Sequence, residues 1–197
     1  MTSLQTRVAN LLTKPADEWR VIASESATVE GLMRNYAAPL AAIPAIGIFI
    51  GYTIVGVSVP LLGTIRYGIV RGFVSACLAF VFALVGAWIN AIVVEKLAPT
   101  FQSRGDTAQA LKLVVYAMTP VWLAGILNLV PLLGILGIVA GLYAIYIFYL
   151  GLPVLMGTPA DKVVPYMVVS ALVIIVVSVV FGSIAAGIVG VGAAATL

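Results

Sequence analysis

The chain has 197 residues, of which 63% are hydrophobic and only 9% are charged, with a formal net charge of +3. Soluble domains usually carry about 25% charged residues, so this composition excludes an ordinary water-soluble protein. There is no His and only one cysteine, Cys77. An intrachain disulfide is therefore impossible, and the commonest metal ligand and proton carrier is missing.

Residues 1–36 are predicted to form a cytoplasmic or interfacial amphipathic region. Four leucine and valine residues follow the spacing of one helix face: Leu4, Val8, Leu11 and Leu12. Lys14-Pro15 ends this helix and opens a second one, in which Trp19 is expected at the level of the lipid headgroups. The alternative is a loosely ordered cytoplasmic tail. No cleavable signal peptide is expected, because the first long apolar run begins only near Ala37.

Residues 37–197 are predicted to form a transmembrane domain of five helices, since one crossing needs about 20 apolar residues. The spans are expected at about 37–62, 72–94, 113–127, 131–150 and 163–184. Leu113–Ala160 contains no charged residue and is long enough for two crossings. Asn128 and Pro131 mark the turn between them, because Asn favours turns and proline lacks the donor that a continuing helix needs. The fold class is therefore an all-α integral membrane protein with amino-terminal interfacial helices.

An odd number of spans places the two termini on opposite sides of the membrane. With the amino terminus inside, eight of the ten Lys and Arg residues fall in inside segments, and only Arg66 and Arg71 fall outside. The positive-inside rule therefore favours a cytoplasmic amino terminus and an exported carboxyl end.

Two patterns of small residues predict helix packing. Gly47 and Gly51 lie four residues apart in the first span, and Gly137 and Gly141 do so in the fourth. Small residues at this spacing let another helix approach closely.

The residue types argue against catalysis. None of the seven carboxylates lies in the middle of a span, and no metal-ligating or phosphate-binding motif occurs. No enzyme activity, metal, cofactor or nucleic-acid partner is expected. A polar surface for a partner is predicted on the cytoplasmic side, with ordinary solvated loop ends as the alternative. Its residues are Trp19, Arg20, Glu25, Glu95, Asp161 and Lys162.

A small channel or transporter is the competing function. Its path would be lined by Asn90, Asn128, Tyr143 and Tyr146. Transporters often place ionisable groups at mid-membrane, and this chain places none there. Packing or capping roles are the simpler reading of these neutral side chains.

Several motifs resemble those of the bacterial branch of the Yip (Ypt-interacting protein) domain family. They are Lys14-Pro15, Trp19-Arg20, Ile22 and Glu25; Tyr36, Pro39-Leu40 and Pro44; Tyr116 and Pro120; and Leu142-Tyr143, Tyr149 to Pro153, Met156, Pro159, Asp161-Lys162 and Tyr166. The resemblance covers nearly the whole chain and implies a five-span membrane protein with a cytoplasmic amino terminus. Eukaryotic members bind Rab GTPases and one another in Golgi and endoplasmic-reticulum membranes. Bacteria lack that traffic, so Rab binding is not carried over.

The favoured function is a non-catalytic adaptor or organiser in the bacterial plasma (inner) membrane. It would contact the lipid bilayer and bind other membrane proteins, or itself, through its small-residue faces.

Overall fold

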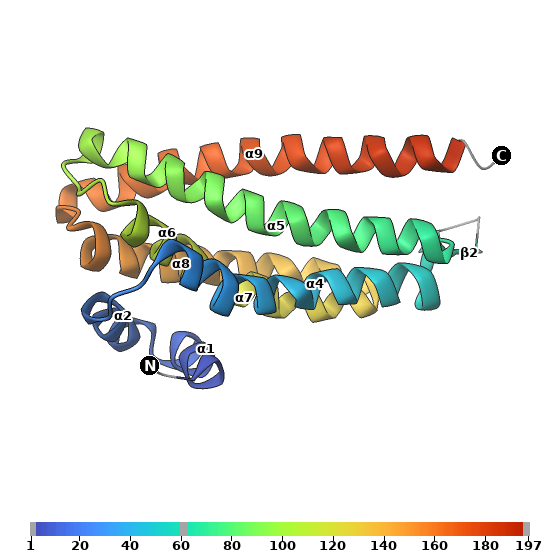
Figure 1. Cartoon of the computed structure of the whole chain (residues 1–197), viewed down its shortest axis with the longest axis horizontal. Helices are drawn as coiled ribbons and strands as arrows, with labels where there is room; N and C mark the ends of the chain where they lie inside the picture. Colours follow the sequence, from blue (N-terminus) through green and yellow to red (C-terminus); the bar gives the residue numbers. More distant parts are fainter. Residues whose placement is uncertain (1–2, 60–62, 195–197) are drawn as a thin grey trace.

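The computed structural model describes residues 3–59 and 63–194 and shows an all-α membrane protein, as the sequence predicts. Five helical segments are long and apolar enough to cross a membrane, and they run side by side along the long axis of the molecule (Figure 1). They are Val29–Val55, Ile69–Phe101, Thr107–Leu129, Gly137–Met156 and Ala160–Ile188.

The first span begins before its predicted start at residue 37. It joins four pieces without a break: α3 (Val29–Leu32), the π-helical η1 (Met33–Ala37), α4 (Ala38–Ile50) and the π-helical η2 (Gly51–Val55). Thr28 caps its start by accepting a hydrogen bond from the amide of Gly31. The polar first turns extend the helix beyond the apolar run, which is why hydropathy alone placed the boundary too late.

The same span also ends earlier than the predicted residue 62. Gly56 has φ of 88°, a conformation that glycine adopts readily and that stops the helix. Two short antiparallel strands follow, β1 (Val57–Val59) and β2 (Gly63–Ile65), with Val57 opposite Ile65. Residues 60–62, which include the predicted end of this span, lie outside the described residues.

The second and fifth spans pack against each other. They are formed by α5 (Ile69–Leu97) with the 3₁₀ turn η3 (Ala98–Phe101), and by α9 (Ala160–Ala194). The Phe82 and Phe181 rings stack at 4.9 Å, and the hydroxyl of Tyr166 donates to the carbonyl of Val94. These contacts run along the two helices in opposite directions, so α5 and α9 form an antiparallel pair.

The third and fourth spans form the predicted hairpin. The third bends between α6 (Thr107–Ala117) and α7 (Thr119–Ala124), where Pro120 occupies the first turn of α7. It continues through the 3₁₀ segment η4 (Gly125–Leu129), and the chain then reverses at the extended residue Val130. A second 3₁₀ segment, η5 (Pro131–Leu136), leads into α8 (Gly137–Met156), which packs against α6 and α7. The chain therefore turns just after Asn128, as expected.

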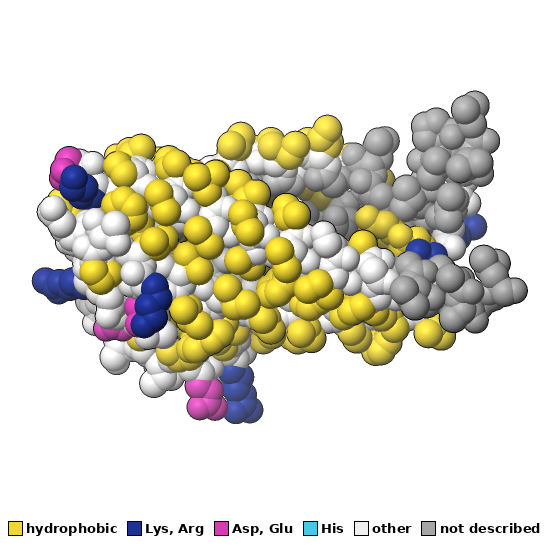
Figure 2. Space-filling view, turned by 90° about the horizontal axis from the view of Figure 1, so that it is seen from above, with side chains coloured by type: hydrophobic (Ala, Val, Ile, Leu, Met, Phe, Trp, Pro, Cys, Tyr) yellow, Lys and Arg dark blue, Asp and Glu magenta, His cyan; other side chains and the backbone are white. Residues whose placement is uncertain are grey.

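Two amino-terminal helices form what we call the arm: α1 (Leu4–Thr13) and α2 (Pro15–Ser24). The arm lies beside the end of the bundle opposite to β2 and to the carboxyl terminus (Figure 1). We call these two ends the arm end and the hairpin end. Figure 2 shows most charged side chains of the visible face near the arm end, with a broad hydrophobic surface between the two ends. This pattern fits a bundle whose middle lies in hydrocarbon.

Candidate functional site

Several fully buried polar contacts lie where the arm docks on the bundle. Trp19 of α2 has no exposed surface, and its indole Nε1 donates to the carbonyl of Ile147 on α8, at 2.9 Å. A Cβ placed on Gly151 would lie 2.7 Å from the Trp19 ring, so this position of α8 has to be glycine for the ring to fit. The expectation that Trp19 lies on an exposed polar surface is wrong, because its side chain is fully buried. Its ring is instead a buried anchor between the arm and α8.

A network of charges holds α1 to α2 beneath this anchor. Arg7 is 4% exposed and donates from Nη1 to Glu18 Oε1 and from Nη2 to both oxygens of Glu25, each at 2.5 Å. Asn10 donates to the other oxygen of Glu18 at 2.8 Å. Burial alone would lower the pKa of Arg7, but the hydrogen bond that it donates to Glu25 and the neighbouring negative charges outweigh this effect and raise the pKa. Arg7 is therefore a permanent cation between two carboxylates.

A second buried cation comes from the bundle. Lys112 of α6 is 2% exposed, and its Nζ donates to the carbonyls of Ile22, at 3.1 Å, and of Glu25. These carbonyls belong to the carboxyl end of α2, where helix carbonyls lack internal partners and the helix dipole is negative. Lys112 therefore caps α2 from the bundle. Sequence reasoning missed this role, because the carbonyl partners of Lys112 lie far from it in the chain.

Aromatic rings connect the network to the first and third spans. The guanidinium of Arg7 lies 5.7 Å from the centroid of the Tyr116 ring, and this ring meets that of Tyr36 edge-on at 4.4 Å. The Tyr36 hydroxyl pairs with Thr119 Oγ1 at 2.7 Å. The first span, the third span and the arm thus share one polar and aromatic cluster.

A hollow of about 760 Å³ lies beside this cluster. Its polar lining includes Arg7, Ser24, Glu25, Asn35, Tyr36 and Tyr116. The hollow opens between the arm and the start of the first span, so it is accessible at the arm end and not from the middle of the bundle.

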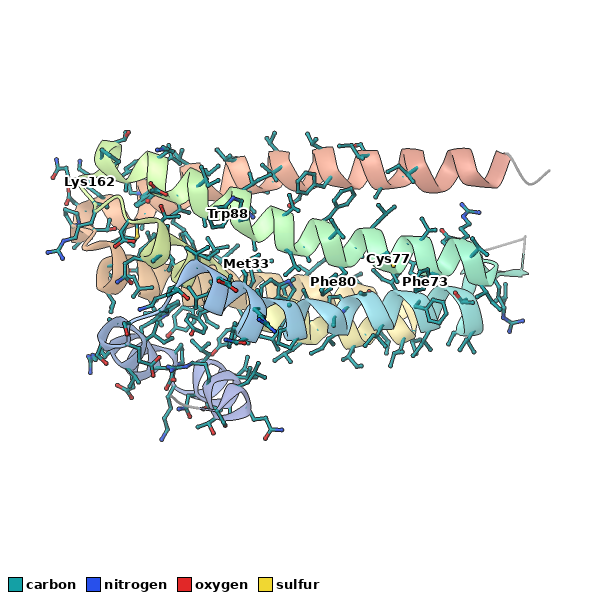
Figure 3. All side chains as sticks on the ribbon, in the orientation of Figure 1. Met33, Phe73, Cys77, Phe80, Trp88 and Lys162 are labelled. Atoms are coloured by element: carbon teal, nitrogen blue, oxygen red, sulfur yellow. The ribbon has the colours of Figure 1, made fainter. Side chains whose placement is uncertain are left out.

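The other residues of the predicted polar surface lie near the same end but make separate contacts. Arg20 is exposed and approaches Asp17 at 3.5 Å, and Asp161 pairs with Lys162 at 3.3 Å. Glu95 accepts a hydrogen bond from Thr107 at 2.6 Å. Figure 3 places Lys162 at the arm end. Of the six predicted residues, only Trp19 and Glu25 take part in the docking of the arm.

The four predicted packing glycines divide into two pairs. A Cβ on Gly51 would lie 1.9 Å from the carbonyl oxygen of Asn128, and one on Gly47 would lie 2.5 Å from that of Gly125. These two glycines let the first span touch η4. A Cβ on Gly137 or Gly141 would meet nothing within 4 Å, so this face of α8 is open.

The residues of the predicted polar path do not form one lining. Asn90 on α5 is buried, and its Oδ1 has no hydrogen-bond partner in the described part of the chain. Asn128 packs beside Gly47, and Tyr143 donates to the carbonyl of Leu12 at 2.8 Å, which adds a further tie to the arm. Tyr146 is half exposed, and its ring lies 5.8 Å from that of Tyr143.

Over residues 3–59 and 63–194, no three His, Cys, Asp or Glu side chains gather into a group that could hold a metal ion. What the arm end does offer is a set of ion pairs, two buried cations and an aromatic cluster.

Comparison with known proteins agrees with this architecture. The model of the Yip1 domain matches residues 9–191. The chain is 30% identical over 149 residues to the inner membrane protein YohC of Escherichia coli K12, covering 74% of this chain and 76% of that protein. It matches YohC of E. coli O6:H1 equally well. No solved structure matches the chain. The family match includes the second arm helix and all five spans, and the chain belongs to the Yip1 domain family.

Proposed function

We propose that this protein is a non-catalytic adaptor that binds other membrane proteins, or a second copy of itself, within the bilayer. The observation that carries the proposal is the open glycine face of α8. Gly137 and Gly141 lie one turn apart with no atom near their Cβ positions, and their neighbours Ile138 and Leu142 are more than 60% exposed. Small residues at this spacing favour close helix–helix approach in membranes, and the chain itself leaves this face free.

The location proposed is the inner membrane of a bacterium, with the amino terminus in the cytoplasm. The location is supported by the E. coli relatives, which are named as inner membrane proteins. The orientation is supported by the concentration of Lys and Arg at the arm end, with Arg66 and Arg71 at the hairpin end.

The absence of catalysis is part of the proposal. The chain has no His, and the most buried carboxylate, Glu18, is engaged by Arg7 and Asn10. Both oxygens of this carboxylate already accept hydrogen bonds from these side chains, so it is poorly placed to take a proton from a substrate.

Transport of an ion or small solute is the second candidate, and one observation favours it. Within the residues that the structure describes, the buried Oδ1 atom of Asn90 has no hydrogen-bond partner, as in a helix interface that admits a polar guest. Against it, the two hollows described lie at the two ends of the bundle, and neither is lined by Asn90, Asn128, Tyr143 or Tyr146.

The test is co-purification of two differently tagged copies, together with other membrane proteins, from mild detergent. Gly137→Leu and Gly141→Leu are expected to reduce recovery of the partner, while each variant keeps its own fold. Gly182→Leu on α9 is the matched control, because a Cβ there also meets nothing within 4 Å. Unchanged recovery in the α8 variants would refute the adaptor face. Solute uptake into proteoliposomes that is abolished by Asn90→Leu would favour transport instead.

A further inference from the structure

The hairpin end carries two arginines and no acidic side chain. All seven Asp and Glu residues belong to the arm or to the segments at the arm end. Among the residues that the structure describes, neither Arg66 nor Arg71 makes an ion pair. The hairpin end therefore has two uncompensated positive side chains at the depth where the apolar spans finish.

The guanidinium of Arg71 is held in place by a tyrosine. It lies 4.3 Å from the centroid of the Tyr67 ring, which in turn lies 5.2 Å from the ring of Tyr52. Arg71 Nε is buried and has no hydrogen-bond partner in the described part of the chain. The guanidinium of Arg71 is thus held in position, and its Nε–H can still donate a hydrogen bond to a ligand.

Arg66 is exposed at the same end of the bundle. Its Nε donates to the carbonyl of Ile54 at 2.9 Å, at the end of the first span. This bond ties the stem of Arg66 to the bundle and leaves the outer nitrogens of the fork toward the solvent.

An apolar hollow of about 270 Å³ opens next to the tyrosine that holds Arg71. It lies between α4, α5 and α9, and its lining includes Tyr52, Tyr67, Leu78, Ala79, Ala185 and Ala186. The three alanines leave room that larger side chains would fill. Tyr67 belongs both to this lining and to the stacking contact of Arg71, so the hollow and the cation adjoin.

We propose that the hairpin end is a binding site for one anionic phospholipid, with its phosphate on Arg71, an acyl chain in the hollow, and Arg66 adding positive charge at the same end. A guanidinium donates two parallel hydrogen bonds to a phosphate, and the charge-assisted bonds are strong. An anionic headgroup is favoured over a zwitterionic one, because no acidic side chain at this end offsets the two arginines. The hollow supplies the apolar contact that a free phosphate ion could not use. This site is separate from the glycine face of α8 and does not depend on the proposed function.

The experiment is native mass spectrometry of the full chain in detergent, with added phosphatidylglycerol or phosphatidylethanolamine. Phosphatidylglycerol should be retained preferentially. Each basic residue near an anionic lipid contributes about 1 kcal/mol, so Arg66→Gln and Arg71→Gln should each lower its retention roughly fivefold. Ala186→Phe keeps both charges and fills the hollow, and it should lower retention as well. Arg20→Gln is the matched control, because it removes an exposed cation at the arm end.

Two further measurements complete the test. Arg71→Lys keeps the charge but loses the bidentate fork, and it should retain an intermediate amount of phosphatidylglycerol while preserving the fold. Inorganic phosphate at millimolar concentration should not displace the lipid. Equal retention of the two lipids, unchanged retention in both glutamine variants, or displacement by phosphate alone would overturn the proposal.

Discussion

Replacing Trp19 with alanine is predicted to release the arm while leaving the five-span bundle folded. Trp19 is fully buried, and truncating a buried Trp to Ala typically costs about 3–5 kcal/mol. The lost hydrogen bond to the carbonyl of Ile147 adds about 1 kcal/mol. Since every 1.4 kcal/mol is tenfold, the equilibrium constant for opening of the arm should rise roughly 100-fold or more.

Hydrogen exchange followed by mass spectrometry measures this opening directly. The amides of α1 and α2 should exchange faster in Trp19→Ala, whereas those of α5 and α8 should not change. Arg20→Ala is the matched control, because this neighbour on α2 has an exposed side chain.

The same contact can be tested from the bundle side. A Cβ on Gly151 would lie 2.7 Å from the Trp19 ring and 2.6 Å from Leu113, so Gly151→Ala should also loosen the arm. Arm exchange that stays at the wild-type rate in both variants would refute the anchoring role of Trp19.

Three further substitutions test the docking network and the core. Arg7→Met leaves the carboxylate of Glu18 buried without its cation and should weaken docking by about 3–5 kcal/mol, measured as arm exchange; an unchanged rate would contradict the network. Lys112→Met removes the cap of α2 and should cost about 1–3 kcal/mol, seen as faster exchange at the carboxyl end of that helix, and a loss confined to α6 would argue against capping. Gly51→Leu would force the first span away from Asn128, where a Cβ lies 1.9 Å from the carbonyl oxygen, and should lower the thermal stability of the solubilised protein. Melting at the wild-type temperature would show that the two helices do not touch.

The number of spans could be predicted from the sequence, because a helix needs a minimum number of apolar residues to cross the hydrocarbon layer. An uncharged stretch of sufficient length has to cross, and a stretch as long as Leu113–Ala160 has to cross twice. The turn after Asn128 was predictable for a local reason: Pro131 lacks the backbone donor that a continuing helix needs, so the preceding helix ends before it. Close helix packing at Gly51 was predictable from the sequence, but its partner in η4 was not.

The docking of the arm could not be predicted, because its contacts join residues far apart in the chain. Trp19 follows a proline and two acidic residues, which is also the pattern of an interfacial helix. What buries its ring is the missing side chain at Gly151, and Lys112 finds its carbonyl partners in α2 only once the arm has folded back. Gly151 lies within Tyr149–Pro153, a motif that resembles the Yip family, and this glycine was the sequence's one hint of a close approach.

The most direct test of the membrane arrangement is cysteine accessibility in intact cells. With Cys77 replaced by serine, single cysteines at Gln5 in the arm and at Arg66 beside β2 are treated with a maleimide that cannot cross membranes. With the arm in the cytoplasm and the hairpin end outside, we expect labelling of Arg66→Cys in intact cells, and of Gln5→Cys only after the inner membrane is permeabilised. Labelling of both positions from the same side would contradict the five-span bundle with its arm and hairpin at opposite ends.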